Sequence, residues 1–249
     1  MVTKHSLVYG AMMPRVRTGP VAGLIFHCTV LAALAASVGL GAAGWVAGLA
    51  SGLVAFVALG HGLQRSAAVA FGAANWVTQT RAGLIGGVAA LTADSLFGRP
   101  APVVVLCALS AVALAMDAVD GSVARRTGGV TPLGARFDME TDAWLILVLS
   151  AYVAETAGPW VLAIGLMRYA IWVATAFVPW LRGPIPPRYW RKVVAAMQGV
   201  TLAVAASGLL PPAVSTTAVA ISLLFLVESF GSELLYRWRR ESLAVAVSS

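Results

Sequence analysis

Charged residues are scarce in this sequence. Only 11% of its 249 residues are Asp, Glu, Lys or Arg, whereas about a quarter is usual for soluble domains. Cysteine and histidine are rarer still, with two and three residues, which excludes a disulfide scaffold. Cys28 and Cys107 lie in apolar runs, so we expect them to be reduced packing residues. Because 59% of the residues are hydrophobic, disorder is excluded as well, and the composition predicts an integral membrane protein.

The sequence is instead rich in long apolar segments. Eight of them are about 20 residues long, which is the length a helix needs to cross the ~30 Å hydrocarbon layer. They cover residues 21–40, 45–63, 77–97, 102–119, 137–157, 160–181, 193–210 and 214–230. The first is longer than the apolar part of a signal peptide, about 7 to 15 residues, so we expect it to be retained. The predicted fold is all-α, a polytopic membrane helical bundle with about eight transmembrane helices.

The net charge is +7, and the positions of the basic residues indicate the membrane topology. With eight spans both termini share one side, and all but two of the 17 Lys and Arg fall in the termini or connections on that side. The two exceptions are Arg99, in a loop on the other side, and Arg168, within a span. Because basic residues mark the cytoplasmic side, we expect a multi-pass protein of the cell membrane with both termini in the cytoplasm. Charge distributed in this way gives no reason to expect a nucleic-acid partner.

Four of the five Asp residues fall within one short stretch. Asp117 and Asp120 end the predicted fourth span, and Asp138 and Asp142 begin the fifth. Spacings of three and four residues place each pair on one helix face. Four carboxylates brought together repel one another, and a divalent cation relieves that repulsion. Because no Cys or His accompanies them, oxygen ligation favours Mg²⁺, Mn²⁺ or Ca²⁺ over zinc. The alternative is that these acids are solvated at helix ends or paired with Arg125, Arg126 and Arg136.

The residues around these acids form an eight-position motif: Asp117, Asp120, Gly121, Ala124, Arg125, Gly134, Asp138 and Asp142. At all eight positions it resembles the signature of the CDP-alcohol phosphatidyltransferase family. The resemblance implies a six-helix catalytic core at 75–230, preceded by an extension with two transmembrane helices at 1–74. A basic, interfacial cytoplasmic tail would follow at 231–249.

The resemblance also implies an activity in phospholipid biosynthesis. A phosphatidyl group would move from CDP-diacylglycerol to the hydroxyl of an alcohol, and CMP would be released. Two ions of Mg²⁺ or Mn²⁺ would be ligated by the four Asp, with Asp142 taking the acceptor proton. Donor contacts would come from Asn75, Thr78, Arg81, Gly121, Ala124, Arg125, Thr131 and Gly134. A homodimer is expected on the same grounds.

Several of these residues also have an ordinary structural explanation. The small residues of the motif suit plain helix packing. Asn75 could cap a helix, Thr78 could bond back to the helix backbone, and Arg81 could extend toward the cytoplasmic surface.

The acceptor is less clearly indicated. Arg168 lies deep in a predicted span and needs an anionic partner there, and further basic residues crowd the loop before the seventh span. The expected acceptor contacts are Arg168, Arg188, Arg191 and Lys192. The series Lys192, Ala195, Ala196 and Gln198 is similar to a pattern in the phosphatidylglycerophosphate and cardiolipin synthase branches, which favours glycerol 3-phosphate. Inositol phosphate, phosphatidylglycerol and an uncharged alcohol stay open.

Two other classes of protein are weighed against this prediction. A membrane cation transporter could use the acids as an ion site, although they lie at helix ends rather than along a path across the bilayer. A catalytically silent relative could keep the acids without turning over a substrate.

Overall fold

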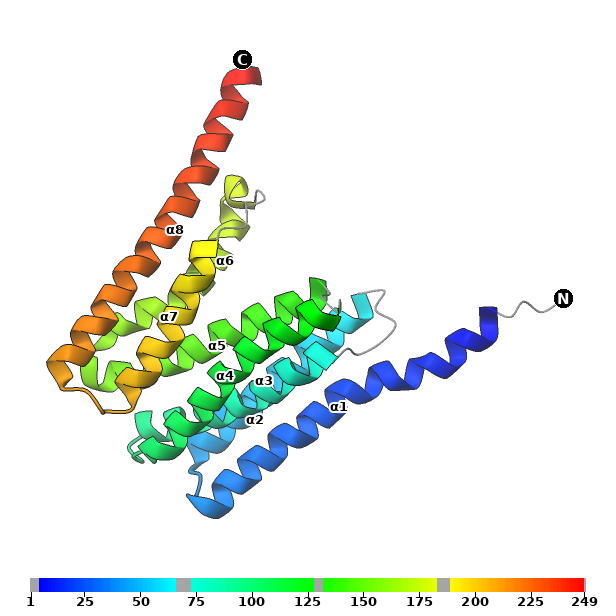
Figure 1. Ribbon diagram of the computed structural model, residues 1–249, viewed down its shortest axis with the longest axis vertical. Helices are drawn as coiled ribbons and strands as arrows, with labels where there is room; N and C mark the ends of the chain where they lie inside the picture. The colour runs from blue at the N-terminus through cyan, green and yellow to red at the C-terminus, as the bar shows by residue number, and fades with distance from the viewer. Residues whose placement is uncertain (1–4, 66–72, 128–131, 183–188, 249) are drawn as a thin grey trace. The chain divides into compact units, whose positions relative to one another are not determined.

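The computed structural model describes residues 5–65, 73–127, 132–182 and 189–248, and the regular structure in these ranges is helical (Figure 1). The α-helices are α1 (His5–Ser37), α2 (Ala42–Arg65), α3 (Ala73–Leu96), α4 (Val103–Thr127), α5 (Pro132–Ala157), α6 (Leu162–Phe177), α7 (Tyr189–Ala206) and α8 (Pro212–Ser248). Two short 3-10 helices, η1 (Pro159–Val161) and η2 (Pro179–Arg182), flank α6. The predicted all-α fold is confirmed.

Each predicted span falls mainly on one of these α-helices. Within the described residues, four segments are long and apolar enough to cross a membrane: Gly19–Ser37, Ala42–Gly62, Pro159–Phe177 and Pro212–Ser242. The apolar part of α4, Val103–Asp117, is shorter. These segments agree with a multi-pass membrane protein, and a crossing by each of the other helices stays a prediction.

The chain forms two compact units, Met1–Leu145 and Ile146–Ser249. The division falls within α5, whose first half belongs to the first unit. The boundaries expected from the sequence, near residues 74 and 230, lie elsewhere and stay predictions. The segment expected to be a tail, 231–249, continues the helix of the eighth span, because α8 runs from Pro212 to Ser248.

Helix α3 is the centre of the first unit, where it packs against α1, α2 and α4. Its middle is buried at Ile85, Val88 and Leu91. Close approach depends on glycine: a Cβ on Gly86 would lie 2.0 Å from Cε1 of His27 on α1. Small residues at such contacts are typical of helices that pack within membranes.

Polar contacts also link the first three helices to one another. Asp94 of α3 is buried and accepts hydrogen bonds from the backbone N–H groups of Gly41 (2.7 Å) and Gly44 (2.6 Å) at the start of α2. His27 of α1 is also buried and donates from Nε2 to the carbonyl of Gly48 (2.8 Å). Helix α2 is thereby joined to α3, and α1 is joined to α2.

In the second unit, α7 pairs with α8. Gln198 of α7 is fully buried; its amide donates to the backbone carbonyl of Ser222 (2.7 Å), and the Ser222 hydroxyl donates back to its Oε1 (3.0 Å). The Trp190 ring meets Phe225 edge-on at 5.8 Å. Gln198, part of the pattern that favours glycerol 3-phosphate, therefore joins two helices.

Candidate active site

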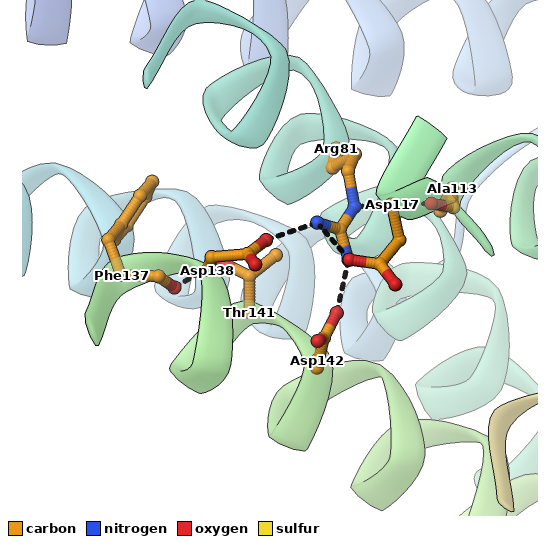
Figure 2. A network of polar contacts seen from close by, with 7 residues as sticks. All are labelled: Arg81, Ala113, Asp117, Phe137, Asp138, Thr141 and Asp142. Atoms are coloured by element: carbon orange, nitrogen blue, oxygen red, sulfur yellow. Dashed lines mark hydrogen bonds and ion pairs between the residues drawn. The ribbon is translucent and has the colours of Figure 1, made fainter. Parts of the chain in front are cut away.

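Three helices of the first unit, α3, α4 and α5, bring one arginine and three carboxylates together (Figure 2). Asp117 comes from α4, and Asp138 and Asp142 lie one turn apart on α5. Each of the three offers a carboxylate oxygen within 4.8 Å of the other two. We call Asp117, Asp138 and Asp142 the acidic cluster.

Arg81 of α3 lies in the middle of the acidic cluster (Figure 2). Its Nη1 contacts Asp138 and lies 3.1 Å from Oδ1 of Asp117, and its Nη2 contacts Asp142. Nε donates to the backbone carbonyl of Ala113 at 3.1 Å. The side chain of Arg81 is 0% exposed, whereas those of the three acids are 35 to 40% exposed. The arginine thus contacts the acids from the buried side, and they keep an accessible side.

The rotation of α5 about its axis decides which side chains face Arg81. Phe137 and Thr141 are buried, and the Thr141 hydroxyl donates to the Phe137 carbonyl (2.8 Å) of its own helix. Trp144 donates from Nε1 to the hydroxyl of Ser51 on α2 (2.9 Å). The burial of Phe137 and Thr141 and the bond from Trp144 to α2 agree with a rotation of α5 in which Asp138 and Asp142 point to Arg81 (Figure 2).

The other donor contacts expected from the sequence have different placements. Asn75 and Thr78 are buried on α3, which begins at Ala73, and they precede Arg81 at three-residue spacing. Gly134 is half-buried on α5. The backbone of α4 includes Asp120, Gly121, Ala124 and Arg125, but their side chains lie outside the described part of the structure, as does all of Thr131.

The expected acceptor residues belong to the second unit. Arg168 is half-buried on α6, Lys192 is exposed on α7, and Arg188 lies outside the described residues. Arg191 of α7 lies 3.6 Å from Glu233 of α8.

The structure places a further arginine, Arg237, beside one of the expected acceptor residues, a neighbour that sequence reasoning missed. Arg237 donates from Nη2 to Glu233 at 2.7 Å, so two guanidinium groups share one carboxylate. The Nε atoms of Arg191 and Arg237 are buried without a hydrogen-bond partner among the described residues. The spacing of four between Glu233 and Arg237 on a helix could have indicated the pair, but the basic composition favours an interfacial tail at 231–249.

The acidic cluster suits a hard divalent cation. Its ligand atoms are all carboxylate oxygens, which Mg²⁺ and Mn²⁺ prefer. It already surrounds one positive group, the Arg81 guanidinium, and its exposed side admits a ligand. The residues present therefore fit a bound metal ion.

The fold and the site together define a class of protein, a membrane helical bundle with a cluster of carboxylates that could hold a cation. A family model described as CDP-alcohol phosphatidyltransferase matches residues 71–228. The chain belongs to the CDP-alcohol phosphatidyltransferase family, and the resemblance predicted from the eight-residue motif is confirmed. All eight motif positions lie inside the matched region.

Known relatives add a second, shorter similarity. Ethanolaminephosphotransferase 1 of Mus musculus is 35% identical over 72 residues, which cover 28% of this chain and 18% of that protein. The chain thus spans less than a fifth of the length of this curated relative. No solved structure matches.

Proposed function

We propose that this chain is a phosphatidyltransferase that moves a phosphatidyl group from CDP-diacylglycerol to the hydroxyl of an alcohol and releases CMP. Family membership over residues 71–228 supports this reaction class. The observation that carries the proposal is the convergence of Asp117, Asp138 and Asp142, with one oxygen of each within 4.8 Å of the others. Transfer of a phosphatidyl group from a diphosphate to a hydroxyl needs positive charge at such a place, because the negative donor diphosphate repels an incoming oxygen.

We assign the metal-holding role to Asp117, Asp120, Asp138 and Asp142, with two ions of Mg²⁺ or Mn²⁺ as the favoured occupants. When bound, such ions neutralise the diphosphate and stabilise the entering and leaving oxygens. Asp142 takes the proton of the acceptor hydroxyl, for which it must come within about 3 Å of that oxygen. The acceptor oxygen forms a new bond to phosphorus, and the bond from phosphorus to the CMP oxygen breaks.

Donor binding is assigned to two stretches of the chain. Arg81 supplies a planar fork that suits a diphosphate, and Asn75 and Thr78 precede it on α3. The small residues of the motif let a nucleotide approach the backbone closely. The full proposed set is Asn75, Thr78, Arg81, Gly121, Ala124, Arg125, Thr131 and Gly134.

Glycerol 3-phosphate is the favoured acceptor. Arg191 and Arg237 around Glu233 leave one positive charge in excess, which a phosphate can neutralise. Arg168, Arg188 and Lys192 complete the proposed acceptor contacts. Inositol phosphate, phosphatidylglycerol and uncharged alcohols are the alternatives.

The proposed setting is the cell membrane, with the active site and both termini in the cytoplasm. It rests on the distribution of Lys and Arg along the sequence. The proposed homodimer rests on the family resemblance alone.

The test is a screen with purified protein, CDP-diacylglycerol, Mg²⁺ or Mn²⁺, and a panel of alcohols, with CMP release as the readout. We expect release only when the correct alcohol is added, first of all glycerol 3-phosphate. A CDP-activated ethanolamine is included as a second donor, because the mouse relative is named an ethanolaminephosphotransferase. Donor binding without release on any alcohol would show a silent relative, and metal flux into proteoliposomes without nucleotide would show a transporter.

A further inference from the structure

Arg81 is fully buried, and each nitrogen of its guanidinium group has a partner. Nε donates to the carbonyl of Ala113, Nη1 contacts Asp117 and Asp138, and Nη2 contacts Asp142. A buried arginine requires such anionic partners, because removing the partner of a buried charge is strongly destabilising. The acidic cluster therefore provides the counter-charge for Arg81.

These carboxylates are the same ones that offer oxygens to a metal ion. A divalent cation among them would lie next to the positive guanidinium group and would be repelled by it. The same oxygens cannot all bind both cations at short range. The Arg81 side chain can relieve this competition by turning away from the carboxylates, which leaves their oxygens to the metal ion.

We propose that Arg81 is an internal counter-cation that a divalent metal ion displaces, and that this exchange couples metal binding to binding of the donor diphosphate. The inference rests on the proposed function. A displaced Arg81 lacks a counter-charge, and the donor diphosphate supplies one in the planar geometry that a guanidinium group prefers. The metal then binds weakly by itself and more tightly when nucleotide is bound. Because binding linkage is reciprocal, the metal raises the affinity for the nucleotide by the same factor.

The experiment measures Mn²⁺ binding to the purified full chain from the electron paramagnetic resonance signal of free Mn²⁺, with and without CDP as a soluble probe. Binding of Mn²⁺ by CDP in the absence of protein is subtracted. In wild type we expect CDP to tighten Mn²⁺ binding. In Arg81→Gln we expect Mn²⁺ alone to bind about tenfold more tightly, within the usual range of coupling between sites, and CDP to add little.

The control is Arg136→Gln, which removes the same charge from an exposed position on α5, two residues before Asp138. We expect its Mn²⁺ affinity to stay close to that of wild type. If Arg81→Gln loses its helical content, Mn²⁺ binding is measured on Arg81→Lys instead. Its ammonium group keeps the buried charge but reaches fewer carboxylates, so its Mn²⁺ affinity should lie above that of wild type.

Unchanged or weaker Mn²⁺ binding in a folded Arg81 variant would overturn the inference, because Arg81 would then order the carboxylates for the metal. Asp117→Asn separates this failure from that of the proposed function. If Mn²⁺ binding does not depend on Asp117, the metal site itself is wrong. If it depends on Asp117 but the Arg81 variants do not tighten it, only the displacement of Arg81 is wrong.

Discussion

Asp142 carries the most specific chemical assignment among single residues. It combines a contact to Arg81 with a partly exposed carboxylate. Asp142→Asn keeps the shape of the side chain but removes the proton acceptor, so we expect turnover to fall by about 100-fold or more while donor binding is largely kept. CMP release and CDP binding, measured on the same preparation, check this.

The matched control for Asp142 is Glu140→Gln, an exposed acid on the same helix. It should keep most of the activity. Full activity of Asp142→Asn would remove the proposed base, and equal losses in both variants would point to a general effect of charge on α5.

The sequence predicts part of this site. Residue spacing shows which side chains share a helix face, but it does not show which helices meet. The separation of three or four residues places two acids on one helix face, and this holds for Asp138 and Asp142. Spacing within one helix does not show that Arg81 of α3 reaches between carboxylates of α4 and α5. In sequence, Arg81 lies 57 residues from Asp138 and 61 residues from Asp142. That contact depends on how the three helices pack.

Among the elements, the junction of α2 with α3 is held by one buried carboxylate. Asp94 accepts two backbone N–H bonds at the start of α2, where a negative charge is also favoured by the helix dipole. Asp94→Ala leaves both donors without this partner, at a cost of about 1–3 kcal/mol for each buried group. We expect a lower thermal unfolding midpoint in detergent, with a smaller loss in Asp94→Asn, which keeps one acceptor oxygen. Equal stability of the alanine variant and wild type would show that this junction does not hold the unit together.

Close packing of α1 on α3 gives a second prediction for the elements. In Gly86→Ala the new Cβ would meet the buried ring of His27 at 2.0 Å, and overpacking of this kind costs about 1–3 kcal/mol. Gly60→Ala is the control, because no packing neighbour among the described residues lies within 4 Å of the new Cβ. Circular dichroism melting of both variants should show a loss for Gly86→Ala alone. A loss of similar size at Gly60 would contradict the packing explanation.

The sequence predicts the helices better than their boundaries. Apolar runs of about 20 residues locate eight helices because the length of a run reflects the thickness of the bilayer. They do not show that α8 continues to Ser248, because its last part is rich in charge and lacks a long apolar run. The break between the two compact units within α5 has no signal in composition either.

For the whole molecule, the charge distribution predicts orientation in the membrane. In a background without Cys28 and Cys107, a cysteine at Arg99 should react with an impermeant thiol reagent in intact cells. A cysteine at Arg136 should react only after the membrane is opened. Both positions are exposed in the structure, so access to the reagent decides the outcome. The opposite pattern of labelling would place the acidic cluster on the outer side and contradict the proposed use of cytoplasmic substrates.

The most direct test of the central claim is a structure of the full chain with Mn²⁺ and CDP bound, in which anomalous scattering locates the metal. We predict Mn²⁺ density bounded by the carboxylates of Asp117, Asp138 and Asp142, with the Arg81 guanidinium turned toward the diphosphate. Mn²⁺ bound elsewhere, with Arg81 still between the three carboxylates while the same preparation releases CMP, would contradict the account.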